Sequence, residues 1–182
     1  MNEPTANDSQ AKQLQVFIQD SKTLDIDSFC NRHARAFLVH NGPLDQKPSE
    51  KLIRQTLTMG AFSGGKTFHP QKDFLVWQIK HSRERTDAHV YSVGREESND
   101  VVIQDESLTL YHAFFKYLGN NQFTILDAAS KNGTFLDDQQ VSAWGQGEPL
   151  SVDSGARIRL GSVEFTFLLA AEFINLVNRL SA

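Results

Sequence analysis

The chain has 182 residues, a formal net charge of −4 and a pI near 5.8. This length fits one domain, or one domain with an extension, and the acidic balance argues against bulk binding of nucleic acid or membranes. The single cysteine, Cys30, excludes an internal disulfide, and no apolar run reaches the roughly 18 residues of a membrane-spanning helix. We therefore expect a cytoplasmic protein.

The N-terminal part of the sequence is predicted to be tail, helix and linker. Residues 1–10 are polar and aperiodic, which is typical of a disordered tail. Residues 11–72 are predicted to form a helical extension and a linker. Apolar spacings of three and four residues indicate one helix after residue 11 and a second from Ile26, with Asp25 or Asp27 as its cap.

From residue 73 onward, short runs rich in strand-forming residues alternate with turn signals. The runs are 74–79, 89–93, 101–103, 112–118, 122–127, 134–136, 157–160 and 163–168. Many short strands at regular spacing predict an all-β sandwich or barrel. Residues 170–182 return to a helical apolar spacing and predict a C-terminal helix that packs on the rest of the fold.

One glycine-rich segment, GAFSGGKT at residues 60–67, matches the pattern of a phosphate-binding loop. In such a loop Lys66 would contact the phosphates and Thr67 a Mg²⁺ ion, between a buried strand and a helix. Residues 54–59 are too polar for that strand, and Pro70 disfavours the helix. We interpret the segment as a linker, and we expect no enzyme, no cofactor and no metal site.

Four polar residues at predicted strand ends have the chemistry of phosphate ligands. Arg95 and Lys131 supply positive charge, Thr109 a hydroxyl group and Asn132 an amide. The planar fork of arginine suits a phosphate ester, which carries about −1.5 to −2 charge at neutral pH. These residues therefore predict a small anion pocket formed by loops.

The order and spacing of the motifs around these residues resemble a forkhead-associated (FHA) domain. The motifs are Gly94-Arg95, Ser98-Asn99-Asp100-Val101, Thr109-Leu110-Tyr111-His112-Ala113, Ser130-Lys131-Asn132-Gly133-Thr134-Phe135, and Leu160-Gly161 with Phe165. The resemblance places the domain at residues 73–169 and implies an FHA-type β-sandwich of about eleven strands, with N-terminal helices and a C-terminal helix. It also implies a module that recognises phosphothreonine peptides.

The resemblance implies a role for each of the four pocket residues. Arg95 is expected to be the main phosphate ligand. Thr109 stands where the family usually has serine and would offer its hydroxyl group to the phosphate. Asn132 would bind the peptide backbone beside the phosphothreonine, and Lys131 lies next to the phosphate.

Five further residues are expected to shape the pocket. Gly94 and His112 have structural roles by resemblance, with His112 bracing the binding loop, and Gly133 and Thr134 shape a turn. Leu110 departs from the family, which commonly has Arg, Lys or Asn there. Losing one charge-assisted hydrogen bond costs about 1.5–3 kcal/mol of binding free energy.

We therefore predict an adaptor that binds phosphothreonine on a partner in Ser/Thr kinase signalling, the partner being a kinase or its substrate. The alternative, favoured by Leu110, is an FHA-fold scaffold for phosphate-independent protein–protein interaction. Phosphorylated Thr5, with Asp8 three residues on, is a candidate internal ligand for self-association. The segment from Phe29 to Val39 is also similar to a leader on some stand-alone bacterial FHA proteins.

Overall fold

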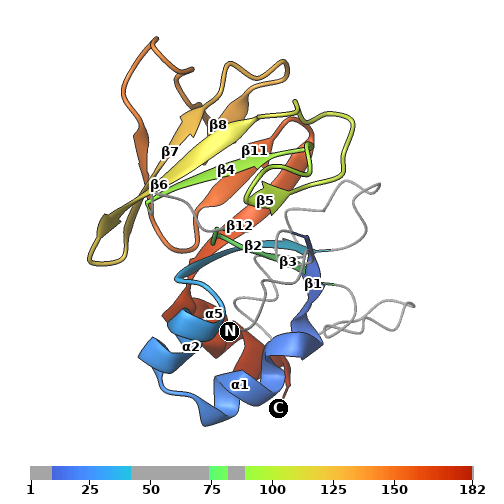
Figure 1. The fold of residues 1–182 in the computed structure, drawn as a ribbon, viewed down its shortest axis with the longest axis vertical. Coiled ribbons are helices and arrows are strands. Elements are labelled where there is room, and N and C mark those ends of the chain that lie inside the picture. The colour runs from blue at the N-terminus through green and yellow to red at the C-terminus, as the bar shows by residue number, and fades with distance from the viewer. Residues whose placement is uncertain (1–9, 42–73, 82–88, 182) are drawn as a thin grey trace.

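The computed structural model describes residues 10–41, 74–81 and 89–181, and every structural statement below refers to these residues. Two β-sheets pack face to face (Figure 1). The larger sheet has the strand order β1 (Lys12–Gln13), β3 (Phe74–Gln78), β2 (Ala36–Asn41), β12 (Val163–Leu169), β11 (Arg157–Leu160), β8 (Thr134–Leu136), β9 (Gln139–Gln140). The smaller has the order β10 (Leu150–Val152), β7 (Gln122–Asp127), β6 (Ala113–Gly119), β4 (Val90–Gly94), β5 (Val101–Val102). The expected mainly β sandwich is confirmed.

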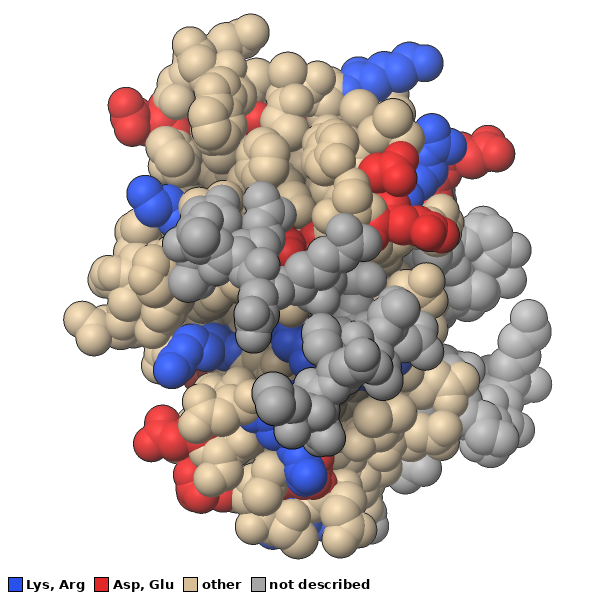
Figure 2. All heavy atoms as spheres, in the orientation of Figure 1, with Lys and Arg blue, Asp and Glu red and all other residues tan. Residues whose placement is uncertain are grey.

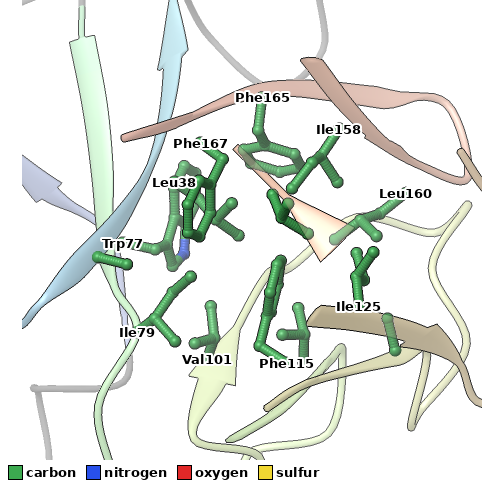
Figure 3. Packing of buried hydrophobic residues seen from close by; sticks show 14 of the residues in the cluster. Leu38, Trp77, Ile79, Val101, Phe115, Ile125, Ile158, Leu160, Phe165 and Phe167 are labelled. Atoms are coloured by element: carbon green, nitrogen blue, oxygen red, sulfur yellow. The ribbon is translucent and has the colours of Figure 1, made fainter. Parts of the chain in front are cut away.

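The main core lies between the two sheets. On β7, Phe123 and Ile125 are buried while Gln122 is exposed, as expected for a strand with one face in the core. Figure 3 shows apolar side chains of both sheets converging, among them Phe115 from the smaller sheet and Phe167 from the larger. Their rings stack with centroids 5.8 Å apart. This core holds the two sheets together and fixes the ends from which the loops leave.

A second core lies on the other face of the larger sheet. The turn η1 (Leu14–Phe17) and the helices α1 (Ile18–Thr23), α2 (Ile26–Arg32) and α5 (Ala170–Leu180) pack against β2, β3 and β12 (Figure 1). The rings of Phe37 and Phe173 stack with centroids 4.0 Å apart. Asp25 caps α2 by accepting a hydrogen bond from the Ser28 N–H, which lowers the pKa of Asp25. The helices thus cover an apolar face of the larger sheet that would otherwise be exposed to solvent.

The sheet reaches further toward the N-terminus than the sequence indicated. Residues 36–41, within the expected helical extension, form β2, which lies between β3 and β12 in the larger sheet. Residues 12–13 pair with β3, so the first helical turn begins only at Leu14. The domain boundaries remain a prediction. The tail at residues 1–9, including Thr5, and the segment at residues 60–67 lie outside the described residues.

Charged side chains of both signs are scattered over one face of the molecule. On the face shown in Figure 2, Lys and Arg side chains stand among Asp and Glu, and the coloured part shows no continuous basic band. No helix in the described ranges is long and apolar enough to cross a membrane. A site for a charged ligand must therefore be sought in local arrangements of side chains.

Candidate functional site: four loops at one end of the sandwich

The first loop of the site begins at Gly94, the last residue of β4. A Cβ atom built on Gly94 would lie 2.2 Å from the carbonyl oxygen of Leu110, so only glycine fits here. This close approach lets Arg95 N–H donate to Thr109 O (3.1 Å) and Glu96 N–H donate to Leu110 O (3.1 Å). The loop that carries Arg95 is therefore joined to the loop that carries Thr109.

The side chain of Asn99, which belongs to the first loop, also connects these two loops. It is fully buried, and its Nδ2 donates to Glu96 O (2.8 Å) and Leu110 O (2.7 Å). At the surface, the hydroxyl groups of Ser98 and Tyr111 form a hydrogen bond between the same two loops (2.6 Å). The two loops are thus connected at their buried base and at their surface.

His112 links the Thr109 loop to the next one. Its Nδ1 accepts a hydrogen bond from Thr109 N–H (3.1 Å), and its Nε2–H donates to Gly133 O (3.2 Å). The ring is fully buried, and this desolvation lowers the pKa of His112, although the bond to Gly133 opposes the shift. A neutral imidazole with this tautomer satisfies both partners. The bracing role expected of His112 stays a prediction, and these contacts are what it would require.

The third loop is a turn built around Asp127. This carboxylate is 4% exposed and accepts from Ser130 N–H (2.8 Å), the Ser130 hydroxyl (2.6 Å) and the Thr134 hydroxyl (2.6 Å). Gly133 lies between them with φ +76°, a left-handed conformation that favours glycine. The turn presents Lys131 and Asn132 to solvent.

Ser107 ties this turn to the fourth loop, which follows β11. Asn132 Nδ2 donates to Ser107 O (2.7 Å), and Ser162 N–H donates to the Ser107 hydroxyl oxygen (2.9 Å). Gly161 N–H donates to Gly133 O (3.1 Å). The Asn132 side chain is therefore held in place by its Nδ2 group, while its Oδ1 atom makes no hydrogen bond within the described residues.

The four expected ligand residues lie on loops that are hydrogen-bonded to one another. Besides the contacts above, the Thr109 hydroxyl oxygen accepts from Lys131 N–H (3.0 Å), which leaves its own hydrogen free to be donated. Within the described part of the chain, the Arg95 guanidinium and the Lys131 ammonium group have no hydrogen-bond or ion-pair partner. Leu110, next to Thr109 in the same loop, has 48% of its surface exposed. These contacts place two positively charged residues and a hydroxyl group on neighbouring, hydrogen-bonded loops.

Sequence reasoning missed the residues that position the loops. Asp127, Ser107 and the side chain of Asn99 are central to the hydrogen-bond network, yet none was assigned a role. The only signal in the sequence was an Asp followed by Ser and Thr three and seven residues later, a common side-chain turn pattern. Among the described residues, no group of three or more His, Cys, Asp or Glu side chains could hold a metal ion.

Comparison with known proteins identifies the family of the segment that carries the loops. The model of the FHA domain family matches residues 91–161. The glycogen accumulation regulator GarA of Mycobacterium tuberculosis is 29% identical over 119 residues, which are 63% of this chain and 68% of GarA. An uncharacterized protein of Mycobacterium bovis, Mb1858, matches with the same values. The matched family segment contains the first three loops described above and Gly161 of the fourth.

Solved structures resemble parts of the chain. EmbR of Mycobacterium tuberculosis in complex with a low-affinity phosphopeptide has 26% identity and a TM-score of 0.40, over 45% of this chain and 20% of EmbR. The FHA domain of the CT664 protein from Chlamydia trachomatis has 17% identity and a TM-score of 0.44, over 73% of this chain and 96% of that one. The family model and the order of the motifs support the same assignment. Residues 91–161 of this chain are an FHA domain.

Proposed function

We propose that this protein is a binding module that captures a phosphothreonine-bearing segment of a partner protein. The observation that carries the proposal is the pair of side-chain cations, Arg95 and Lys131, on loops that also present the Thr109 hydroxyl group. A phosphate ester needs charge and several donors at once, and such charge-assisted bonds are the strong ones. Binding and release require no chemical change in the partner, so the proposed role is that of an adaptor.

In this proposal each residue has a distinct task. Arg95 binds the phosphate with its guanidinium fork, and Lys131 adds a second charge. Thr109 donates its hydroxyl hydrogen while its oxygen stays bound to Lys131 N–H (3.0 Å). Asn132 accepts a backbone N–H of the peptide through Oδ1. A Ser/Thr kinase would create the mark, and the partner is that kinase or one of its substrates.

A second candidate function is a scaffold that binds partners without phosphate. It is favoured by Leu110, which follows Thr109 in the same loop, presents an apolar, half-exposed side chain and contributes no side-chain donor. In the phosphothreonine proposal, phosphorylated Thr5 of the same or a neighbouring chain is one further candidate ligand. The similarity to GarA, whose name describes a regulator, agrees with a regulatory role for either candidate.

Calorimetric titration with a degenerate phosphothreonine peptide library and its unphosphorylated counterpart tests the proposal. We expect wild-type protein to prefer the phosphorylated peptides, and Arg95→Ala to weaken their binding by about 10- to 100-fold. Arg32→Ala is the matched control, because Arg32 is an exposed arginine of α2 in the helical layer that pairs with Asp20. Equal binding of both libraries by wild-type protein would refute phosphothreonine recognition and favour the scaffold.

A further inference from the structure

A groove lies beside the proposed phosphate site. It has a volume of ≈ 690 Å³ and is lined by the turn at residues 129–133, by the segment at residues 140–143 and by Gln146. Its walls include Lys131 and Asn132 but neither Arg95 nor Thr109. The groove is therefore continuous with the phosphate site without being that site. Its size falls within the range of ordinary ligand-binding clefts.

The groove is lined by hydrogen-bonding groups that have no partner in the described chain. Gln140 and Gln146 are exposed, and neither side-chain amide makes a hydrogen bond within the described residues; the same holds for the Ser142 hydroxyl group. Each of these side chains can donate and accept. The groove thus offers several unused donors and acceptors along one path.

The groove is also close to electrically neutral. Its carboxylate, Asp127, is buried and already accepts three hydrogen bonds from its own turn. Its cation, Lys131, would be engaged by the phosphate in the proposed function. A charged side chain entering the groove would lose water without gaining a counter-ion, whereas an uncharged polar side chain would find partners.

Resting on the proposed function, we propose that this groove is a second contact for the same phosphorylated segment. The residues that flank the phosphothreonine cross the turn at Asn132 and enter the groove in extended form. Their side chains there are small or polar and uncharged, and they bond to Gln140, Ser142 and Gln146. The groove would then set which phosphorylated sites the protein selects.

The chain contains a natural reporter for this groove. Trp144 directly follows a groove residue, is 65% exposed and packs edge-on against Phe114, with ring centroids 5.7 Å apart. The other tryptophan, Trp77, is 1% exposed and lies in the main core. A change in tryptophan emission on peptide binding will therefore come from Trp144, and Trp144→Phe should abolish it.

The test compares two synthetic phosphopeptides. The short one has a single alanine on each side of phosphothreonine, and the long one adds several Ser, Gln and Ala residues to both ends. We expect wild-type protein to bind the long peptide about tenfold more tightly and to change its emission only with that peptide. The double variant Gln140→Ala/Gln146→Ala should lose this gain, whereas Gln122→Ala, in the β6–β7 hairpin, should keep it.

A charge variant makes the test sharper. Gln140→Glu/Gln146→Glu should prefer a long peptide that carries Lys in its flanks over the neutral one, while its affinity for the short peptide stays within a few-fold of wild type. Equal affinities of short and long peptides for wild-type protein would overturn the groove proposal and leave phosphothreonine binding intact. If neither phosphopeptide binds, the proposed function fails, and the groove proposal fails with it.

Discussion

Gly94→Ala is the substitution whose effect can be worked out most fully from the structure. Gly94 does not adopt the left-handed conformation, so its backbone alone would accept alanine. The obstacle is the Leu110 carbonyl group, because the new Cβ atom would lie 2.2 Å from its oxygen and 2.9 Å from its carbon. Real Cβ atoms essentially never approach closer than 3.0 Å, so the two backbones must separate by about 0.8 Å.

That separation acts on three hydrogen bonds at once. Arg95 N–H to Thr109 O, Glu96 N–H to Leu110 O, and Asn99 Nδ2 to Leu110 O all cross the gap between the two loops. Each contributes about 0.5–1.5 kcal/mol, and overpacking adds about 1–3 kcal/mol. We expect Gly94→Ala to lower the free energy of unfolding by roughly 3–6 kcal/mol, against a typical total of about 5–15 kcal/mol.

Urea unfolding followed by circular dichroism measures this loss, with Gly145→Ala as the matched control. Gly145 has φ +75° but nothing within 4 Å of a built Cβ atom, so its substitution costs only about 1–2 kcal/mol of backbone strain. Gly94→Ala should therefore be clearly the more damaging of the two. If it proves as mild as Gly145→Ala, the reasoning that the close approach to Leu110 holds these loops together is wrong.

Two further predictions concern the loop from Leu110 to His112. Leu110→Arg restores a donor beside Arg95 and should tighten phosphothreonine-peptide binding about tenfold in calorimetry, whereas Leu118→Arg, an equally exposed leucine at the end of β6, should not. The folded-state pKa of His112 lies below its ordinary value of 6.5, so the unfolded chain binds more protons in the window between the two values. The stability from neutral His112 is present above pH 6.5 and is lost as the pH falls through the folded pKa. Urea unfolding across this pH range should show that acid lowers the free energy of unfolding less for His112→Gln than for wild type. An equal loss of unfolding free energy in both proteins would contradict a neutral, buried His112.

Much of the sandwich could be predicted because its strands carry their pattern in their own residues. The runs at 122–127, 134–136 and 157–160 coincide with β7, β8 and β11. In each, burial alternates along the strand, so composition and turn signals mark the same bounds as the backbone pairing. The helix at residues 170–180 could be predicted equally well because its buried residues recur at helical spacing.

Other strands could not be predicted because no local pattern marks them. β9 is two exposed glutamines, and β1 is two residues that become a strand only by pairing with β3. β2 is buried on both faces, one toward Phe165 and the other toward the helices. Its sequence therefore lacks the alternation of a half-buried strand and could not be told apart from the helical pattern that precedes it. Long-range pairing, which the sequence does not display, decides these cases.

The candidate site likewise contains residues that could be proposed from the sequence and residues that could not. Its expected ligand residues could be proposed from residue type and spacing, since charged and hydroxyl groups at strand ends suggest an anion site. Its buried supports were not, because Asn99 and Asp127 act through backbone groups that are distant from their own side chains in sequence. The structural role of a buried polar residue depends on its hydrogen-bond partner, and that partner is known only once the positions of the loops are known.

In the proposed function, the buried supports lower the cost of binding a peptide. The buried side chains Asn99, His112 and Asp127 hold the loop backbones before any ligand arrives, so the peptide need not order them. The groups left to be ordered are the long side chains of Arg95 and Lys131, each at a cost of about 0.5–1.5 kcal/mol. In the proposed function, a few charge-assisted bonds to phosphate would exceed that cost even without a donor at position 110. If the proposed function holds, these buried supports contribute to affinity as well, because a loop freed from them would have to be ordered by the peptide itself.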